Sequence, residues 1–254
     1  MDFGLANWMC VFVRAGALLS VFPLFSSQNF PIQVRLALGA SLAFLVAPTL
    51  PPAPVAGLSL GATITLIAGE VGIGLVLGFA SRMVFYAIDF AGGIIATEIG
   101  LTFSPNMNPF SNAQQDSPGL VLYFLAAMLM LSLDLHHWLL LAFQRTYQFL
   151  PIGHAGLREA LLEDILRRSS GIFLLAVQLA APIIAVSFLM SLVFSVLGRA
   201  VPQMNVFVES FSFRLLIGLG VFGLTLNLMA QHLLNYLRRL PDDLLRVAQL
   251  LNVG

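Results

Sequence analysis

Charged side chains inside otherwise apolar stretches are the residues of this 254-residue chain with the clearest chemical potential: Arg14, Glu70, Arg82 and Asp89. A charge in an apolar segment is costly unless it faces protein or water, so such residues often mark ion or proton pathways. Glu70 has two interpretations, an acid that couples ions to transport or a hydrogen-bonded contact between helices. The second is favoured, because a single intramembrane acid defines no proton relay.

His136 and His137, with Asp134 nearby, raise metal binding as an alternative. Neighbouring side chains of a helix point about 100° apart, so we expect the two imidazoles to diverge rather than share one ion. Their position beside Trp138, at the end of an apolar segment, is typical of an interfacial belt. No Walker loop, Ser/His/Asp order or paired-carboxylate spacing stands out elsewhere. We therefore predict no metal site, no cofactor and no enzymatic activity.

The composition of the chain indicates the environment that surrounds these charged residues. Hydrophobic residues make up 59% of the chain, charged residues only 9%, and the mean hydropathy is +0.93, far above what a soluble domain carries. The twelve basic residues are all arginine and are balanced by twelve acids. The formal net charge is zero, so there is no electrostatic case for nucleic acid as a partner.

Long apolar stretches predict an all-α integral membrane protein, a single membrane domain over residues 1–254. A helix needs about 20 mostly apolar residues to cross the hydrocarbon core. About six segments come close to this length: Gly4–Phe25, Ile32–Leu50, Leu58–Phe90, Gly119–Leu141, Gly171–Leu197 and Phe213–Leu234. The third is too long for one plain span, and its glycines allow a neighbouring backbone to approach closely. Breaks are possible at Pro23, Pro31, Pro48, Pro182 and Pro202.

Two stretches of the chain have a different, amphipathic texture. Residues 155–170 alternate charged residues with leucines, and the pairs Glu163–Arg167 and Asp164–Arg168 have the four-residue spacing of helical ion pairs. We expect a helix at the membrane surface here. The tail at 236–254 repeats this pattern after Pro241 and is expected to lie on lipid or on a partner.

The segment at 101–118, between the third and fourth apolar stretches, combines proline, asparagine and serine with large apolar side chains. Proline and asparagine argue against regular helix, whereas the apolar groups argue against a freely solvated linker. An ordinary interhelical loop is one interpretation, and a plug that fills and gates a lumen is the other. The plug residues would be Phe103, Pro105, Met107, Pro109 and Phe110.

Motifs spread over nearly the whole chain resemble one family. The most specific is the run from Gly198 to Phe207, GRAVPQMNVF. The others are Arg14 with Pro23, Pro31, Arg35 and Pro48; Glu70-Val71-Gly72-Ile73-Gly74 leading to Gly78; Gly92 with Glu98-Ile99-Gly100-Leu101 and Asn108-Pro109; and Pro151-Ile152-Gly153. In their order and spacing the chain resembles the R-subunit (FliR) family of the bacterial flagellar export gate. More distantly, it is similar to the matching subunit of virulence-type injectisomes.

The resemblance implies a function that hydropathy does not supply. Family members join P- and Q-type subunits in a helical gate that passes unfolded export substrates, next to the B-type export switch subunit. This implies a multi-pass protein of the bacterial inner membrane, in lipid at the flagellar basal body. Its plug would be the Phe103–Gln114 stretch, and some hairpins would sit partly above the bilayer.

Eight further positions are implied to have structural or subunit-packing roles: Glu70, Gly72, Gly74, Gly78, Arg199, Pro202, Gln203 and Asn205. The flagellar branch rests on Ile99-Gly100-Leu101 and the following loop, and an injectisome subunit is the alternative. An ion-coupled secondary transporter is the alternative from another class. It should contain internal repeats, and no convincing repeat relates the two halves of the chain.

Overall fold

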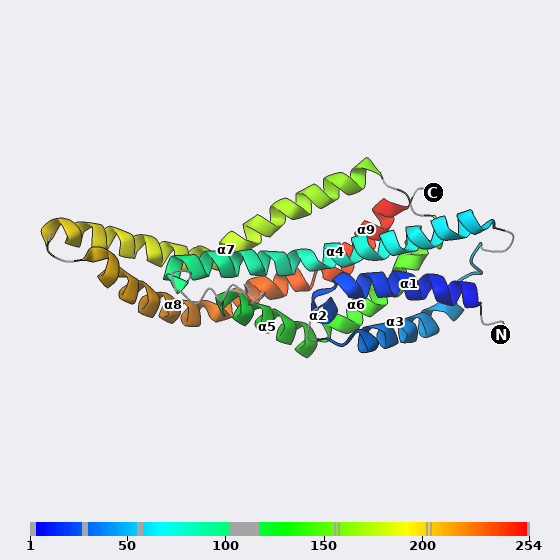
Figure 1. Cartoon of the computed structure of the whole chain (residues 1–254), viewed down its shortest axis with the longest axis horizontal. Helices are drawn as coiled ribbons and strands as arrows, with labels where there is room; N and C mark the ends of the chain where they lie inside the picture. Colours follow the sequence, from blue (N-terminus) through cyan, green and yellow to red (C-terminus); the bar gives the residue numbers. More distant parts are fainter. Residues whose placement is uncertain are drawn as a thin grey trace. The chain divides into compact units, whose positions relative to one another are not determined.

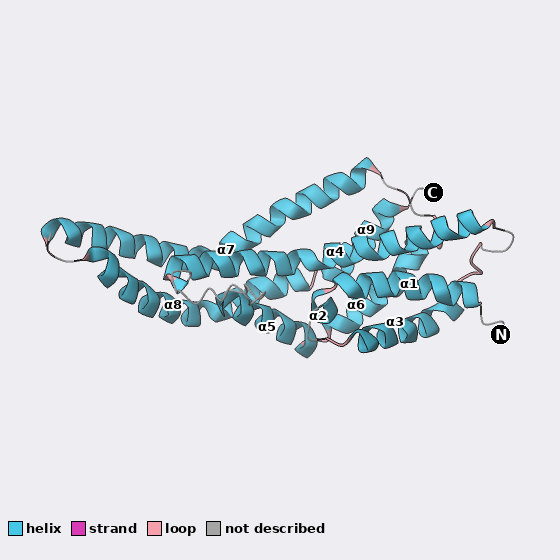
Figure 2. Ribbon diagram, viewed as in Figure 1, coloured by secondary structure: helices cyan, strands magenta, loops and turns pink. Residues whose placement is uncertain are grey.

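Helices are the regular elements of the residues that the computed structural model describes, which are 4–26, 30–54, 58–101, 117–154, 156, 158–201, 203 and 205–252. Figure 1 shows their order along the chain, and Figure 2 shows that ribbon helices account for almost all of the described backbone. The predicted all-α class is confirmed. The elements are α1 (Leu5–Val21), α2 (Pro23–Ser26), α3 (Ile32–Val46), the 3₁₀ turn η1 (Ala47–Thr49), α4 (Leu60–Ile99), α5 (Ser117–Ser132), α6 (Leu135–Phe149), α7 (Glu159–Ala200), α8 (Val206–Leu237) and α9 (Leu240–Leu251).

Prolines set several of these boundaries. Helix α1 stops before Pro23 because the residue ahead of a proline avoids helical geometry, and Phe22 is extended with ψ 127°. Pro31 is the N-cap of α3. Pro182 behaves differently, since α7 runs through it without interruption over 42 residues. Apolar helices tolerate such a proline where neighbouring groups satisfy the freed backbone.

The fourth predicted segment, Gly119–Leu141, is not one straight helix. Helices α5 and α6 meet at a break with a bend of 73°. Asp134 lies at this break with φ 55°, in the left-handed region that non-glycine residues rarely adopt. The left-handed residue ends one helix and redirects the chain into the next.

Among the described residues, four helical stretches are long and apolar enough to cross a membrane, or five if the bent α5–α6 pair counts as one span. The shorter apolar helix α1 adds a sixth apolar segment. Helix α4 is 40 residues long, which corresponds to about 60 Å, twice the roughly 30 Å of a hydrocarbon core. An upright α4 therefore extends well beyond the hydrocarbon core.

Two compact units divide the chain. The first comprises Met1–Met83, Asp134–Ser169 and Arg238–Gly254. In it α1 packs along α3, and α6 packs along α9. Its core joins Cys10 and Val11 of α1 to Ala43 of α3 and Phe143 of α6. Cys10 is a free, buried thiol that serves as a small apolar side chain.

The second unit comprises Val84–Leu133 and Ser170–Leu237. Helices α5 and α8 pack together in it, and its buried side chains come from all four of its helices. Gly92 of α4 and Gly119 of α5 touch through their backbones, and a Cβ at Gly92 would overlap the Cα of Gly119. Gly218 of α8 receives the side chain of Ile99 in the same way. Small residues thus set the helix contacts, as is typical of membrane helices.

The charged stretch at 155–170 forms the beginning of α7, which starts at Glu159. The Asp164–Arg168 pair predicted from spacing is confirmed at 2.5 Å. Asp164 is buried and also accepts from Arg246 of α9 at 3.0 Å, while Arg168 reaches Asp243 of α9 at 2.6 Å. These ion pairs tie the start of α7 to the C-terminal helix.

Helices α1 and α4 approach each other closely in the first unit. A Cβ at Gly74 would overlap the backbone carbonyl oxygen of Arg14 and lie 2.7 Å from the Cβ of Ala17. One turn further, a Cβ at Gly78 would lie 2.9 Å from the carbonyl oxygen of Leu18. Because residues four apart share a helix face, Glu70, Gly74 and Gly78 form one stripe of α4 against α1.

We predict opposite effects for two alanine substitutions on α4. Gly74→Ala places a methyl group against the α1 backbone and should reduce the stability of the detergent-solubilised chain by about 1–3 kcal/mol. Gly72→Ala meets no atom within 4 Å and should be neutral or stabilising by up to about 1 kcal/mol, through helix propensity. Thermal unfolding followed by circular dichroism measures both, and equal midpoints would contradict the close approach.

Candidate functional site

A fully buried ion pair joins α1 to α4. Arg14 is 0% exposed and Glu70 is 1% exposed. Arg14 Nε donates to Glu70 Oε2 at 2.6 Å, and Arg14 Nη1 donates to the carbonyl oxygen of Leu150 at 3.1 Å. The pair connects three parts of the chain that are 56 and 136 residues apart. Glu70 is thus hydrogen-bonded to another helix of the same chain, as in the second interpretation of this acid.

The turn after α6 closes the pair from the other side. The backbone N–H of Gly153 donates to Glu70 Oε1 at 3.2 Å, and Gly153 has φ 84°, which favours glycine. The guanidinium carbon of Arg14 lies 4.0 Å from the centre of the Tyr147 ring, a cation–π distance. The Pro151-Ile152-Gly153 motif therefore has a role in this first unit: it supplies a donor to the buried acid.

This arrangement can hold helices together but offers no obvious catalytic chemistry. Both oxygens of Glu70 accept a hydrogen bond, so neither is presented to a solute. Breaking such a buried pair leaves an uncompensated charge in an apolar environment. Arg14 Nη2 and the Tyr147 hydroxyl are buried with no hydrogen-bond partner among the described residues. Tyr147 also lines a cavity of about 230 Å³ whose nine lining residues include four prolines.

The other two charges singled out in apolar segments lie in different surroundings. Arg82 Nη1 lies 3.5 Å from the carbonyl oxygen of Val21 and 3.4 Å from Ser26 Oγ, both near the end of α1. Asp89 lies in the second unit, on an exposed groove of α4 that Glu98 also lines. Neither residue belongs to the Arg14–Glu70 network.

The two histidines do not diverge as the sequence predicted. The ring centres of His136 and His137 lie 4.0 Å apart, and His137 Nδ1 lies 3.2 Å from Asp134 Oδ1. One ligand atom from each of the three residues fits within 4.8 Å. The left-handed Asp134 at the helix start brings the acid back toward the imidazoles. Asp134 and His137 are 71% and 64% exposed, and the absence of a metal stays a prediction.

Several residues implied by the resemblance lie elsewhere. Gly72 is on an open face of α4. Arg199 is exposed in the last turn of α7, and Gln203 is exposed in the turn that follows. Asn205 Oδ1 accepts from the backbone N–H of Val208 at 3.5 Å, as at a helix start. The following lie outside the described residues: Phe103, Pro105, Met107, Pro109, Phe110 and Pro202.

Sequence reasoning missed the partners of the ion pair. It named Arg14 and Glu70 separately but not their contact, and it gave no role to Tyr147 or to the Leu150 carbonyl. The glycine of the Pro-x-Gly turn was the available signal, because a glycine at a turn suggests a positive φ and a specific backbone donor.

The fold and the buried ion pair together define an all-helical membrane protein whose helices are joined by an internal salt bridge. Residues 5–240 match the family described as bacterial export proteins, family 1. The chain is 30% identical to the flagellar biosynthetic protein FliR of Escherichia coli (strain K12) over 236 residues, 92% of this chain and 90% of the relative. The FliR of Bacillus subtilis (strain 168) is 30% identical over 205 residues, 79% and 78% of the two chains. The chain therefore belongs to family 1 of the bacterial export proteins, and FliR proteins are among its relatives.

We predict strong coupling between Arg14 and Glu70. Arg14→Met alone and Glu70→Leu alone should each lower the free energy of unfolding by about 3–5 kcal/mol, because each leaves one buried charge unpaired. The double variant should lose clearly less than the sum. Equilibrium unfolding in mixed detergent micelles measures this cycle, with Glu163→Gln, an exposed acid of α7, as the control that changes little. Additive losses would contradict the pairing.

Proposed function

We propose that this chain is a subunit of the type III protein export gate of the bacterial flagellum, where it helps to form and plug the channel for unfolded flagellar proteins. The observation that carries the proposal is the family match over residues 5–240. The flagellar relatives cover most of both chains, which supports the flagellar branch over an injectisome. In this role the chain is a non-enzymatic component of the bacterial inner membrane.

Exposed apolar side chains support a location in the membrane, in contact with lipid and with other subunits. Leu224 is 86% exposed, Leu216 is 75% exposed and Met128 is 69% exposed within this chain alone. Many exposed large apolar side chains are typical of surfaces that contact membrane or protein. P- and Q-type gate subunits are the proposed partners, together with the B-type export switch and the unfolded substrates themselves.

A secondary transporter is the weaker candidate. Its coupling acid would be Glu70, and that acid is closed off by Arg14 and by Gly153. A transporter site also gathers discontinuous helices at the membrane midplane, whereas α4 continues through Glu70 as one helix. The geometry at Glu70 thus supports a structural role within the gate.

The plug is proposed for the segment between α4 and α5. Its support is the sequence, which places large apolar residues among prolines between two apolar helices. Side chains that fill a lumen exclude water and thereby block ions, which is how apolar constrictions gate channels. The charged stretch at 155–170 is proposed as an amphipathic face toward lipid or neighbouring subunits. In the tail at 236–254, only the polar side of α9 is proposed to face them, since Leu244, Val247 and Leu251 are buried within this chain.

The composition of the extracted complex tests the proposal for the gate. When this chain is produced with the P- and Q-type subunits of the same organism and extracted in mild detergent, we expect one stable hetero-oligomer that contains all three. Native mass spectrometry measures its composition. Recovery of the chain as a stable monomer or a symmetric homo-oligomer, with both partners present and unbound, would contradict the proposal.

Deletion of Ser104–Asn112 tests the plug. Removing the stopper while keeping the helices should increase ion leakage across the inner membrane, and Phe110→Ala should give a smaller increase because one of several apolar groups is lost. Leakage is measured with a potential-sensitive dye in cells that contain the assembled complex. Ser111→Ala, a polar position of the same segment, is the control. Unchanged leakage in both test variants would show that the segment is a passive connection.

A further inference from the structure

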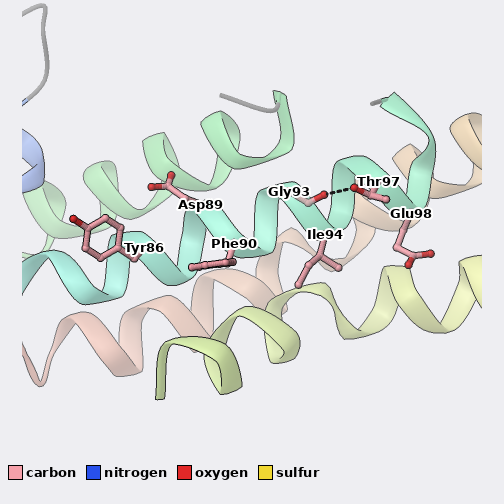
Figure 3. A pocket seen from close by; sticks show the side chains of 7 residues that line it. All are labelled: Tyr86, Asp89, Phe90, Gly93, Ile94, Thr97 and Glu98. Carbon is pink, nitrogen blue, oxygen red and sulfur yellow. Dashed lines mark hydrogen bonds between the residues drawn. The ribbon is translucent and has the colours of Figure 1, made fainter. Parts of the chain in front are cut away.

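A groove runs along one face of α4 in the second unit (Figure 3). Its seven lining residues recur every three to four positions from Tyr86 to Glu98, which places them on one side of the helix over about three turns. Every other residue between Val84 and Gly100 is buried within this chain. Within the described part of the chain, the groove is therefore the face of this part of α4 that is not buried.

The groove has an apolar middle and carboxylates toward both ends. Phe90 is half exposed, and its ring packs against that of Phe173 on α7 with 5.3 Å between centres. Gly93 also lines the groove and contributes no side chain, a feature of close helix contacts in membranes. Asp89 and Glu98 are nine residues apart, or about 13 Å along the helix. None of the lining residues is basic.

The carboxylate of Glu98 is the acidic group of this groove for which we look for a partner. Its backbone carbonyl accepts from Ser187, but its carboxylate has no hydrogen bond or ion pair with the described residues. Thr97 nearby needs no partner, because its hydroxyl donates to the carbonyl oxygen of Gly93 at 2.8 Å (Figure 3). A carboxylate on an apolar, membrane-length helix is costly unless a positive group or water compensates it.

Arg214 of α8 is a candidate partner within the chain, because it lines a small gap of about 10 Å³ together with Glu98. Its Nη2 donates instead to Ser191 Oγ at 2.9 Å. Arg214 thus lies near Glu98 without forming an ion pair with it. The alternative to a partner subunit is therefore that Glu98 pairs with Arg214 of its own chain, and the experiment must distinguish the two.

We propose that this groove receives an apolar transmembrane helix of another gate subunit, and that this helix carries an arginine or lysine that pairs with Glu98. Charge complementarity selects a basic partner, the glycine in the middle allows close packing of backbones, and the length of about three turns suits a helix rather than a small solute. The inference rests on the proposed gate and names the chemistry of one of its contacts.

Photo-crosslinking in the assembled complex tests the inference. Benzoylphenylalanine at Ile94, in the middle of the groove, should crosslink to an apolar helix of a P- or Q-type subunit, with an Arg or Lys within about two turns of the adduct. The same probe at the exposed Leu224 of α8 should map to a different site. An adduct with lipid alone, or with a helix that lacks a basic residue, would overturn the proposal.

Charge exchange supplies the second readout. Glu98→Arg should lower recovery of the assembled complex at least tenfold, and reversing the charge of the crosslinked partner residue should restore it. Arg214→Gln should leave recovery unchanged. Equal losses for Glu98→Gln and Arg214→Gln would instead show an intrachain role. Normal thermal unfolding of the isolated Glu98→Arg chain confirms that it folds.

The two proposals fail in different ways. If the unaltered chain forms no complex with the P- and Q-type subunits, the proposed function is wrong. If that complex forms, and Glu98→Arg forms it equally well, only the helix-docking inference is wrong.

Discussion

The Arg14–Glu70 pair is the contact that most constrains the first unit. An ion pair with no exposure to solvent is tolerated only where further donors and acceptors complete it, and here the Leu150 carbonyl and the Gly153 N–H do so. The same geometry requires α1 and α4 to lie close together, which the glycine stripe at 74 and 78 permits. The ion pair and the glycine stripe therefore both favour the same contact between α1 and α4.

Much of this architecture follows from simple sequence patterns. Hydropathy identified the apolar helices, and the glycines of the third apolar segment indicated the close approach of a neighbouring backbone. The bend at Asp134 was not predicted, since neither glycine nor proline stands there, although aspartate adopts the left-handed region more readily than most non-glycine residues. The close approach of His136 and His137, next to this left-handed residue, was not predicted either. Pro182, by contrast, suggested a break that the helix does not make.

The pairing of Arg14 with Glu70 was likewise beyond sequence reasoning, because periodicity describes one helix at a time and says nothing about which face meets which. The groove on α4 has the same origin. Its stripe from Tyr86 to Glu98 is distinguished only by the burial of all the other faces, and that burial depends on α5, α7 and α8. The apolar surroundings of Arg14 and Glu70 predicted that each charge would have a partner. Which residue is that partner depends on how the helices pack.

The glycine contact between α4 and α5 has a consequence for the segment that joins them. Gly92 and Gly119 hold the two helices backbone to backbone, and a Cβ at Gly92 would overlap the Cα of Gly119. A larger side chain at Gly92 would therefore push α4 and α5 apart. The distance between the two helices that bracket the proposed plug thus depends on a position that has no side chain.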